Sequence, residues 1–147
     1  ANEKSRDKSR TPMQWNSEAY VGFSEVDPWI TISDQARNIH VENQLNDPNS
    51  MLSYYKNLLR LRSEHPSLQL GEYELLKYEE EVIYFIRTDL NEKLFIFLNF
   101  SNQTKSIDIK DYKNTEFKSL LSSKRKSLDV LRELVVLPNE ALIVKGV

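Results

Sequence analysis

Short apolar segments separated by polar turns fill the chain from Leu68 onward. Residues 82–88 and 94–100 are rich in β-branched and aromatic side chains, and the polar stretch 89–92 lies between them. Two such segments joined by a short polar stretch predict an antiparallel hairpin. Comparable segments recur about every 8–12 residues, which is typical of an antiparallel β-sandwich. The expected strands are 68–78, 82–88, 94–100, 106–109, 117–121, 134–137 and 141–145.

Residues 47–65 carry the pattern of one amphipathic helix. Leucines and tyrosines recur there at i, i+3, i+4 and i+7, which makes one broad apolar face. Asp47 is a suitable N-cap, and Pro48 suits the first helical position. His65 and the arginines before it suit the negative end of the helix dipole, and Pro66 is expected to end the helix.

Residues 1–46 show no sustained period of 2 or 3.6 residues and are expected to be irregular. They nevertheless contain Trp15, Phe23 and Trp29. A loop of this length with so much aromatic surface is uncommon in a small domain and needs a surface to pack on. We therefore expect its usual partner to lie outside this chain. In the chain alone the segment is expected to be partly mobile, or to associate with another copy through its exposed aromatic side chains.

Composition excludes several kinds of site and partner. The net charge of −2 argues against nucleic acid or an anionic membrane as the main partner. No cysteine is present, so disulfides are excluded and a reducing compartment is indicated. The polar N-terminal residues do not resemble a signal peptide, so a cytoplasmic location is expected. His40 and His65 lie far apart in sequence without neighbouring ligands, so neither a metal nor a cofactor is expected.

One segment carries a specific resemblance. Residues 5–15 read SRDKSRTPMQW. They resemble the SRD-x-x-RTPMQW stretch of glycoside hydrolase family 13, in its oligo-1,6-glucosidase, maltase and trehalose-phosphate hydrolase branch. Further similarities follow in the same order along the chain, which makes chance similarity improbable. They lie at 22–23 (GF), 28–30 (PWI), 38–44, 47–50 (DPNS), 54–62, 71–73 and 98–100 (LNF).

The resemblance implies a mainly β fold class with a remnant of a barrel. In the family a (β/α)8 barrel precedes an antiparallel β-sandwich. Residues 1–67 then correspond to the end of the catalytic barrel, with the loop after strand eight at 1–46 and the final helix at 47–65. Residues 68–147 correspond to the C-terminal sandwich. A complete barrel needs about 250 residues, so the family's nucleophile, acid/base and third catalytic carboxylate would lie outside this chain.

The same resemblance implies roles for several side chains. Arg10 is the first candidate to bind the non-reducing glucose unit at the −1 subsite, and Arg6 is the second. The planar guanidinium suits this task because it donates several hydrogen bonds in a fixed geometry. Asp7, flanked by these arginines, is expected to stay ionised in a structural ion pair. Trp15 and Trp29 are read as buried loop anchors, with sugar stacking as the alternative.

No catalytic residue is expected in this chain. Retaining hydrolysis needs two carboxylates about 5–5.5 Å apart, and no motif here would fix such a pair. The acidic run 79–81 is better explained as a solvated turn. The sequence also departs from the family at Asn16, where aspartate is usual, and at Tyr20 and Val21, where asparagine and alanine are usual.

The interpretation is therefore the C-terminal part of an α-glucosidase that acts on α-linked gluco-oligosaccharides by a retaining mechanism and is inactive alone. The missing barrel is its expected partner, and the sandwich is expected to shield the last barrel helix. Two other readings stay open. One is a non-catalytic interaction domain, like the ectodomain of amino-acid transporter heavy chains. The other is a carbohydrate-binding sandwich, which exposed coplanar aromatic side chains on one sheet face would support.

Overall fold

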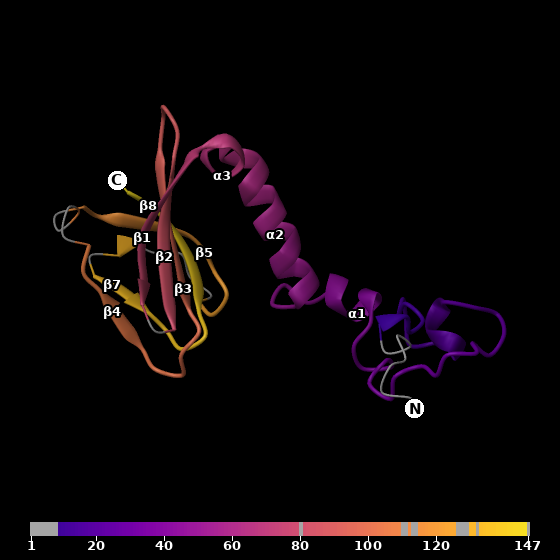
Figure 1. Cartoon of the computed structure of the whole chain (residues 1–147). Coiled ribbons are helices and arrows are strands. Elements are labelled where there is room, and N and C mark those ends of the chain that lie inside the picture. The colour runs from indigo at the N-terminus through magenta and orange to yellow at the C-terminus, as the bar shows by residue number, and fades with distance from the viewer. Residues whose placement is uncertain are drawn as a thin grey trace. The chain divides into compact units, whose positions relative to one another are not determined.

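The computed structural model describes residues 9–79, 81–109, 112, 115–125, 130–131 and 133–146. The chain forms two compact units, Ala1–Lys56 and Asn57–Val147. The first unit is mostly irregular and contains the five-residue helix α1 (Val41–Leu45) and a 3-10 turn at Ala19–Gly22. The long helix α2 (Met51–Glu64) begins in the first unit and ends in the second (Figure 1). Of the predicted site residues, Arg6 and Asp7 lie outside the described residues.

The helix predicted at 47–65 exists but begins later. α2 starts at Met51, so Asp47 is not its N-cap and Pro48 is not its first residue. Instead the Asp47 carboxylate accepts the backbone N–H of Asn49 at 2.8 Å, which closes a turn before the helix. The Ser50 hydroxyl accepts the N–H of Ser53 at 3.1 Å and thereby caps α2.

Pro66 ends α2, as expected, but it also begins a second short helix. α3 (Pro66–Leu70) occupies the position where a strand was expected from Leu68. Proline suits the first turn of a helix because it has no N–H to leave unpaired. Gly71 then leads directly into the first strand. A Cβ at this position would lie 2.7 Å from the Thr88 carbonyl oxygen, so the close approach of α3 to the sheet requires glycine.

The second unit is the antiparallel β-sandwich that the sequence predicts (Figure 1). The hairpin at 89–92 is confirmed, because the N–H of Asp89 donates to the carbonyl of Glu92 at 3.1 Å. The larger sheet has the order β1-β2-β3-β8-β5-β6, and the smaller one pairs β4 with β7. The strands are β1 (Glu72–Glu79), β2 (Val82–Thr88), β3 (Lys93–Asn99), β4 (Lys105–Ile107), β5 (Phe117–Ser122), β6 (Val130–Leu131), β7 (Leu134–Val136) and β8 (Ala141–Gly146).

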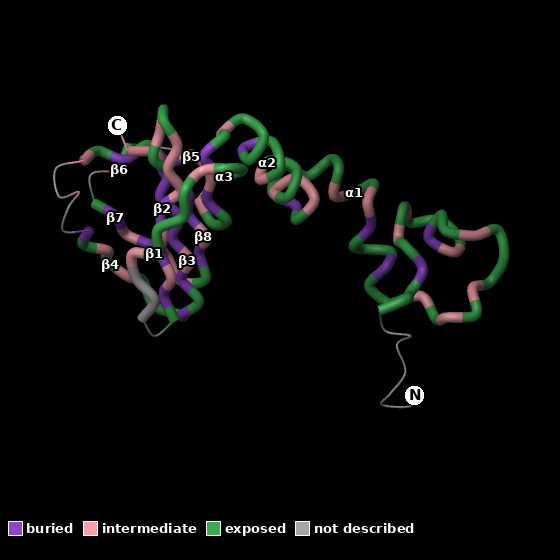
Figure 2. The backbone as a smooth tube through the Cα atoms, turned by 45° about the horizontal axis from the view of Figure 1, so that its top comes forward, coloured by how far each residue is buried: buried purple, intermediate pink, exposed green. Residues whose placement is uncertain are grey.

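The larger sheet is apolar on both faces. Its inner face joins the smaller sheet in one core, in which Phe95, Phe97 and Val136 are at most 1% exposed. Its outer face carries a second cluster built on Leu94 and Ile96. The central strand β3 is therefore buried on both sides, which explains its nearly continuous apolar sequence (Figure 2).

The outer cluster confirms that the long helix packs on the sandwich. Leu61 near the end of α2 is 8% exposed and belongs to this cluster, and Leu58 packs against it. Leu68 of α3 lies beside them. The last turns of α2 thus bring part of the apolar face predicted for residues 47–65 against the sheet.

Candidate functional site

The motif segment, residues 5–15, has an exposed arginine, and its backbone is held by hydrogen bonds a few residues later. Arg10 is exposed, whereas Pro12 is buried. Farther along, the carbonyl of Gln14 accepts the N–H of Val41 at 2.9 Å, and the carbonyl of Trp15 accepts the N–H of Glu42 at 3.0 Å. The motif segment is therefore attached by two backbone hydrogen bonds to the start of α1.

His40 caps that helix. Its Nδ1 accepts the N–H of Asn43 at 3.3 Å, and the Asn43 side-chain oxygen accepts the N–H of His40 at 3.1 Å. This reciprocal arrangement is a capping box. His40 is 7% exposed, so the imidazole is held inside the unit. Sequence reasoning missed this role because a capping box usually pairs Ser or Thr with Glu or Gln, and only the three-residue spacing could have indicated it.

A second set of hydrogen bonds passes from α1 to α2. The Gln44 side-chain oxygen accepts the N–H of Leu52 at 3.1 Å, in the first turn of α2. The Ser50 hydroxyl, which caps α2, donates to the Gln44 carbonyl at 2.7 Å. Hydrogen bonds thus connect the motif segment to the start of α1, and α1 to the start of α2.

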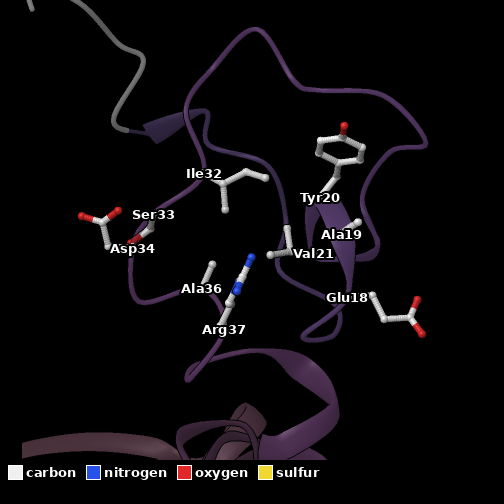
Figure 3. A pocket seen from close by; sticks show the side chains of 9 residues that line it. All are labelled: Glu18, Ala19, Tyr20, Val21, Ile32, Ser33, Asp34, Ala36 and Arg37. Atoms are coloured by element: carbon white, nitrogen blue, oxygen red, sulfur yellow. The ribbon is translucent and has the colours of Figure 1, made fainter.

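A pocket of about 520 Å³ lies beside the 3-10 turn of the first unit. In Figure 3 the Arg37 side chain points toward Val21, whereas the carboxylates of Glu18 and Asp34 point away. Arg10 is not among the lining residues, so the structure does not bring the predicted substrate-binding arginine to this pocket. The lining residues are Glu18, Ala19, Tyr20, Val21, Ile32, Ser33, Asp34, Ala36 and Arg37.

The two tryptophans are not buried within their unit. The exposed fractions are 50% for Trp15 and 87% for Trp29. Neither indole therefore anchors the loop by burial against the residues described. A burial role would need a surface beyond the described residues of this unit, and self-association through such exposed side chains stays a prediction.

Two family models match the chain in succession. The alpha amylase catalytic domain matches residues 1–71, and the maltogenic amylase C-terminal domain matches residues 73–132. The two matches meet beside Gly71, immediately before β1. The chain belongs to the alpha-amylase family. The resemblance carried by residues 5–15 is thereby confirmed.

Relatives of this alpha-amylase-family chain include the oligo-1,6-glucosidase of Parageobacillus thermoglucosidasius, 37% identical over 145 residues. That match covers 97% of this chain and 26% of the relative. The α-glucosidase of Pediococcus pentosaceus is 49% identical over 72 residues, which cover 49% of this chain and 13% of the relative. The chain spans about a quarter of the length of the curated relatives that match nearly all of it.

Solved structures support the same family. Trehalose-6-phosphate hydrolase of Bacillus licheniformis has a TM-score of 0.83 and 33% identity, and the match covers 97% of this chain and 26% of that chain. Trehalulose synthase of Pseudomonas mesoacidophila MX-45 has a TM-score of 0.85 and 27% identity, with the same coverage.

The buried carboxylates of this alpha-amylase-family chain are engaged in structural contacts. The Glu92 side chain is 7% exposed and contacts His65 and Lys145, and the Glu140 side chain is 0% exposed and contacts Arg125. Within the described residues, no group of three or more His, Cys, Asp or Glu side chains could hold a metal ion. No helix in the described part of the chain is long and apolar enough to cross a membrane.

The 3-10 turn stores backbone strain that a substitution should relieve. Tyr20 has φ 53° and Val21 has φ 54°, both in the left-handed region that disfavours side chains other than Asn, Asp and Gly. We expect Tyr20→Asn to stabilise the first unit by about 1 kcal/mol, because asparagine adopts this conformation readily. Both tryptophans lie in this unit, so tryptophan fluorescence during urea unfolding reports on it. Tyr55→Asn, at an exposed helical tyrosine, is the control and should give no gain.

Proposed function

We propose that the chain is the C-terminal part of an α-glucosidase that hydrolyses terminal α-glucosidic bonds of oligosaccharides by a retaining mechanism. The observation that carries the proposal is the match over 97% of this chain to an oligo-1,6-glucosidase, together with the ordered motif of residues 5–15. In this proposal the barrel of the same enzyme supplies the nucleophile and the acid/base. The absence of cysteine supports a cytoplasmic location as part of the same proposal.

Arg10 is proposed to bind the terminal glucose unit, with Arg6 as the second candidate and Asp7 as an ion-pair partner. Three features support a binding role for Arg10. Its side chain is exposed, and the buried Pro12 restricts the backbone two residues later. The carbonyls of Gln14 and Trp15 are held by α1. A guanidinium on a held backbone can donate to neighbouring sugar hydroxyls without first losing the freedom of a mobile loop.

The isolated chain is proposed to be inactive. Retaining hydrolysis needs one nucleophilic and one protonated carboxyl group about 5–5.5 Å apart. Glu92 and Glu140 belong to separate hydrogen-bond networks of the sandwich, and their side chains are 7% and 0% exposed. Glu140 is held in an ion pair with Arg125. Burial would raise the pKa of Glu92, but hydrogen bonds from Lys145, His65 and Ser67 hold this pKa below its ordinary value, which disfavours a general acid.

A chimera tests the proposal. The last quarter of the Parageobacillus oligo-1,6-glucosidase would be replaced by this chain, and hydrolysis of an aryl α-glucoside would be measured. We expect the chimera to be active and the chain alone to be inactive. Arg10→Lys in the chimera should lower kcat/KM by roughly 10–100-fold, since an ammonium lacks the planar fork.

The controls separate a binding role from a loss of folding. Arg60→Lys, at an exposed arginine of α2, should leave kcat/KM within about twofold, as expected for a surface ion pair of low energy. A folded chimera without activity would contradict the proposed function and favour a non-catalytic interaction domain. Unchanged kinetics in the Arg10→Lys variant would instead contradict only the role of Arg10.

The exposed aromatic pair that the structure describes on the sheet does not support the carbohydrate-binding interpretation. Tyr73 and Phe85 form an aromatic pair on the outer face of β1 and β2, with Tyr73 56% exposed. Their ring planes are inclined by 41°. A flat stacking platform for a sugar needs coplanar rings, so this pair does not favour a carbohydrate-binding module.

A further inference from the structure

The start of α1 has a complete set of hydrogen-bond partners. The first N–H groups of a helix have no partner within the helix and must find one elsewhere. Here the N–H groups of Val41 and Glu42 donate to the Gln14 and Trp15 carbonyls, and that of Asn43 donates to His40 Nδ1. Two of the hydrogen bonds that cap α1 are therefore the same bonds that attach the motif segment to it.

We infer that His40 is a positioning residue, which holds α1 in place and through it keeps Arg10 in the geometry needed for substrate binding. The inference rests on the proposed function. It assigns to His40 no contact with substrate. The imidazole acts indirectly. It caps α1, and the first N–H groups of α1 donate to the carbonyls of residues 14–15.

The connection to Arg10 is short and stiff. Only three residues separate Arg10 from Gln14, and the middle one is the buried Pro12, whose ring fixes the backbone φ angle. If α1 loses its cap, the two hydrogen bonds at residues 14–15 loosen with it. The guanidinium then samples more orientations, and small misplacements of a binding group are costly to catalysis.

The chemistry at His40 defines the test variants. An N-cap needs a side-chain acceptor at short reach from the backbone, which His40 supplies through Nδ1. Asparagine supplies an equivalent acceptor through its amide oxygen, so His40→Asn should keep the cap. Alanine has no acceptor, so His40→Ala should lose it. Asn46→Ala is the matched control, because the Asn46 side chain donates to the Glu42 carbonyl at the other end of the same helix.

Hydrogen exchange in the 147-residue chain tests the attachment itself. We expect His40→Ala to lower the protection of the Val41, Glu42 and Asn43 amides about fivefold, as the loss of an N-cap implies. His40→Asn and Asn46→Ala should leave these amides within about twofold of the unsubstituted chain. Unchanged protection in His40→Ala would overturn the inference.

Kinetics of the chimera test the consequence for substrate binding. We expect His40→Ala to raise KM about tenfold, with kcat per folded enzyme within about threefold, and His40→Asn to restore KM. A merely structural role would lower the folded fraction and leave KM unchanged, which would overturn the positioning role. An inactive unsubstituted chimera would contradict the proposed function, and with it the positioning role. The exchange measurement would still decide whether His40 holds the segment.

Discussion

Replacing Glu140 by alanine is expected to destabilise the sandwich by about 3–5 kcal/mol, the range for removing one partner of a buried ion pair. The Glu140 side chain is 0% exposed and pairs with Arg125 at 2.8 Å. It also accepts the Ser122 hydroxyl at 2.6 Å and the N–H of Leu137 at 2.6 Å. Alanine would leave three donors facing an empty space that the carboxylate filled.

The expected loss can be separated from a general effect of losing a glutamate. Glu133→Ala is the matched control, because Glu133 is exposed in the same unit. It should change the free energy of unfolding by less than about 0.5 kcal/mol. The double variant Glu140→Leu with Arg125→Met should recover much of the loss, since replacing both charges removes the unpaired one. Urea unfolding followed by far-UV circular dichroism measures all four proteins. A loss below 1 kcal/mol in Glu140→Ala would contradict the prediction.

Glu92→Gln is expected to cost the sandwich about 2–3 kcal/mol at neutral pH, the range for hydrogen bonds to a charged group. The Glu92 carboxylate joins three elements. It contacts His65 at 2.9 Å after α2, Ser67 at 2.8 Å in α3, and Lys145 at 3.0 Å in β8. A glutamine side chain has only one accepting atom, its amide oxygen, because its amide nitrogen is a donor. It therefore cannot replace the carboxylate as the acceptor for all three partners.

The same carboxylate should give the sandwich an acid-dependent stability. Burial alone would raise the pKa of Glu92, but hydrogen bonds from Lys145, His65 and Ser67 outweigh it and hold the pKa below the ordinary 4.5. Because the folded pKa is depressed, the stabilisation is fully present above the unfolded value. It is lost as pH falls through the folded pKa.

The test compares the pH dependence of unfolding in two variants. Glu92→Gln should flatten the decline of stability below pH 4.5, because the titrating group is gone. Glu64→Gln, whose carboxylate forms an exposed pair with Arg60 at 3.9 Å, should keep the decline and cost less than about 0.5 kcal/mol. If the free energy of unfolding of Glu92→Gln declined below pH 4.5 as steeply as that of the unsubstituted chain, the acid dependence could not be assigned to Glu92.

Sequence patterns predict the regular elements well where local periodicity decides them. The strands at 82–88, 94–100 and 141–145 match β2, β3 and β8 within one residue at each end. The hairpin turn at 89–92 follows from its polar composition between two apolar segments. These elements are readable because each strand carries its own apolar pattern and each turn its own polar residues.

Helix ends are less predictable because a cap depends on competing hydrogen bonds. Asp47 has the right side chain for an N-cap, but it accepts from Asn49, and Ser50 caps α2 instead. Pro66 both ends one helix and begins another. The short helix α1 has no amphipathic period, and its first turn depends on carbonyls at residues 14–15, far upstream in the sequence.

The sequence by itself determined the family, the strand-rich sandwich and Arg10 as the first candidate for binding, because these rest on an ordered motif and on local periodicity. Only the tertiary structure decided which residues hold the motif segment and which hold the sandwich together. His40, Glu92 and Glu140 act through partners that are distant in sequence or through backbone groups. Such contacts leave no periodic pattern, since they depend on how the folded backbone brings single donors and acceptors together.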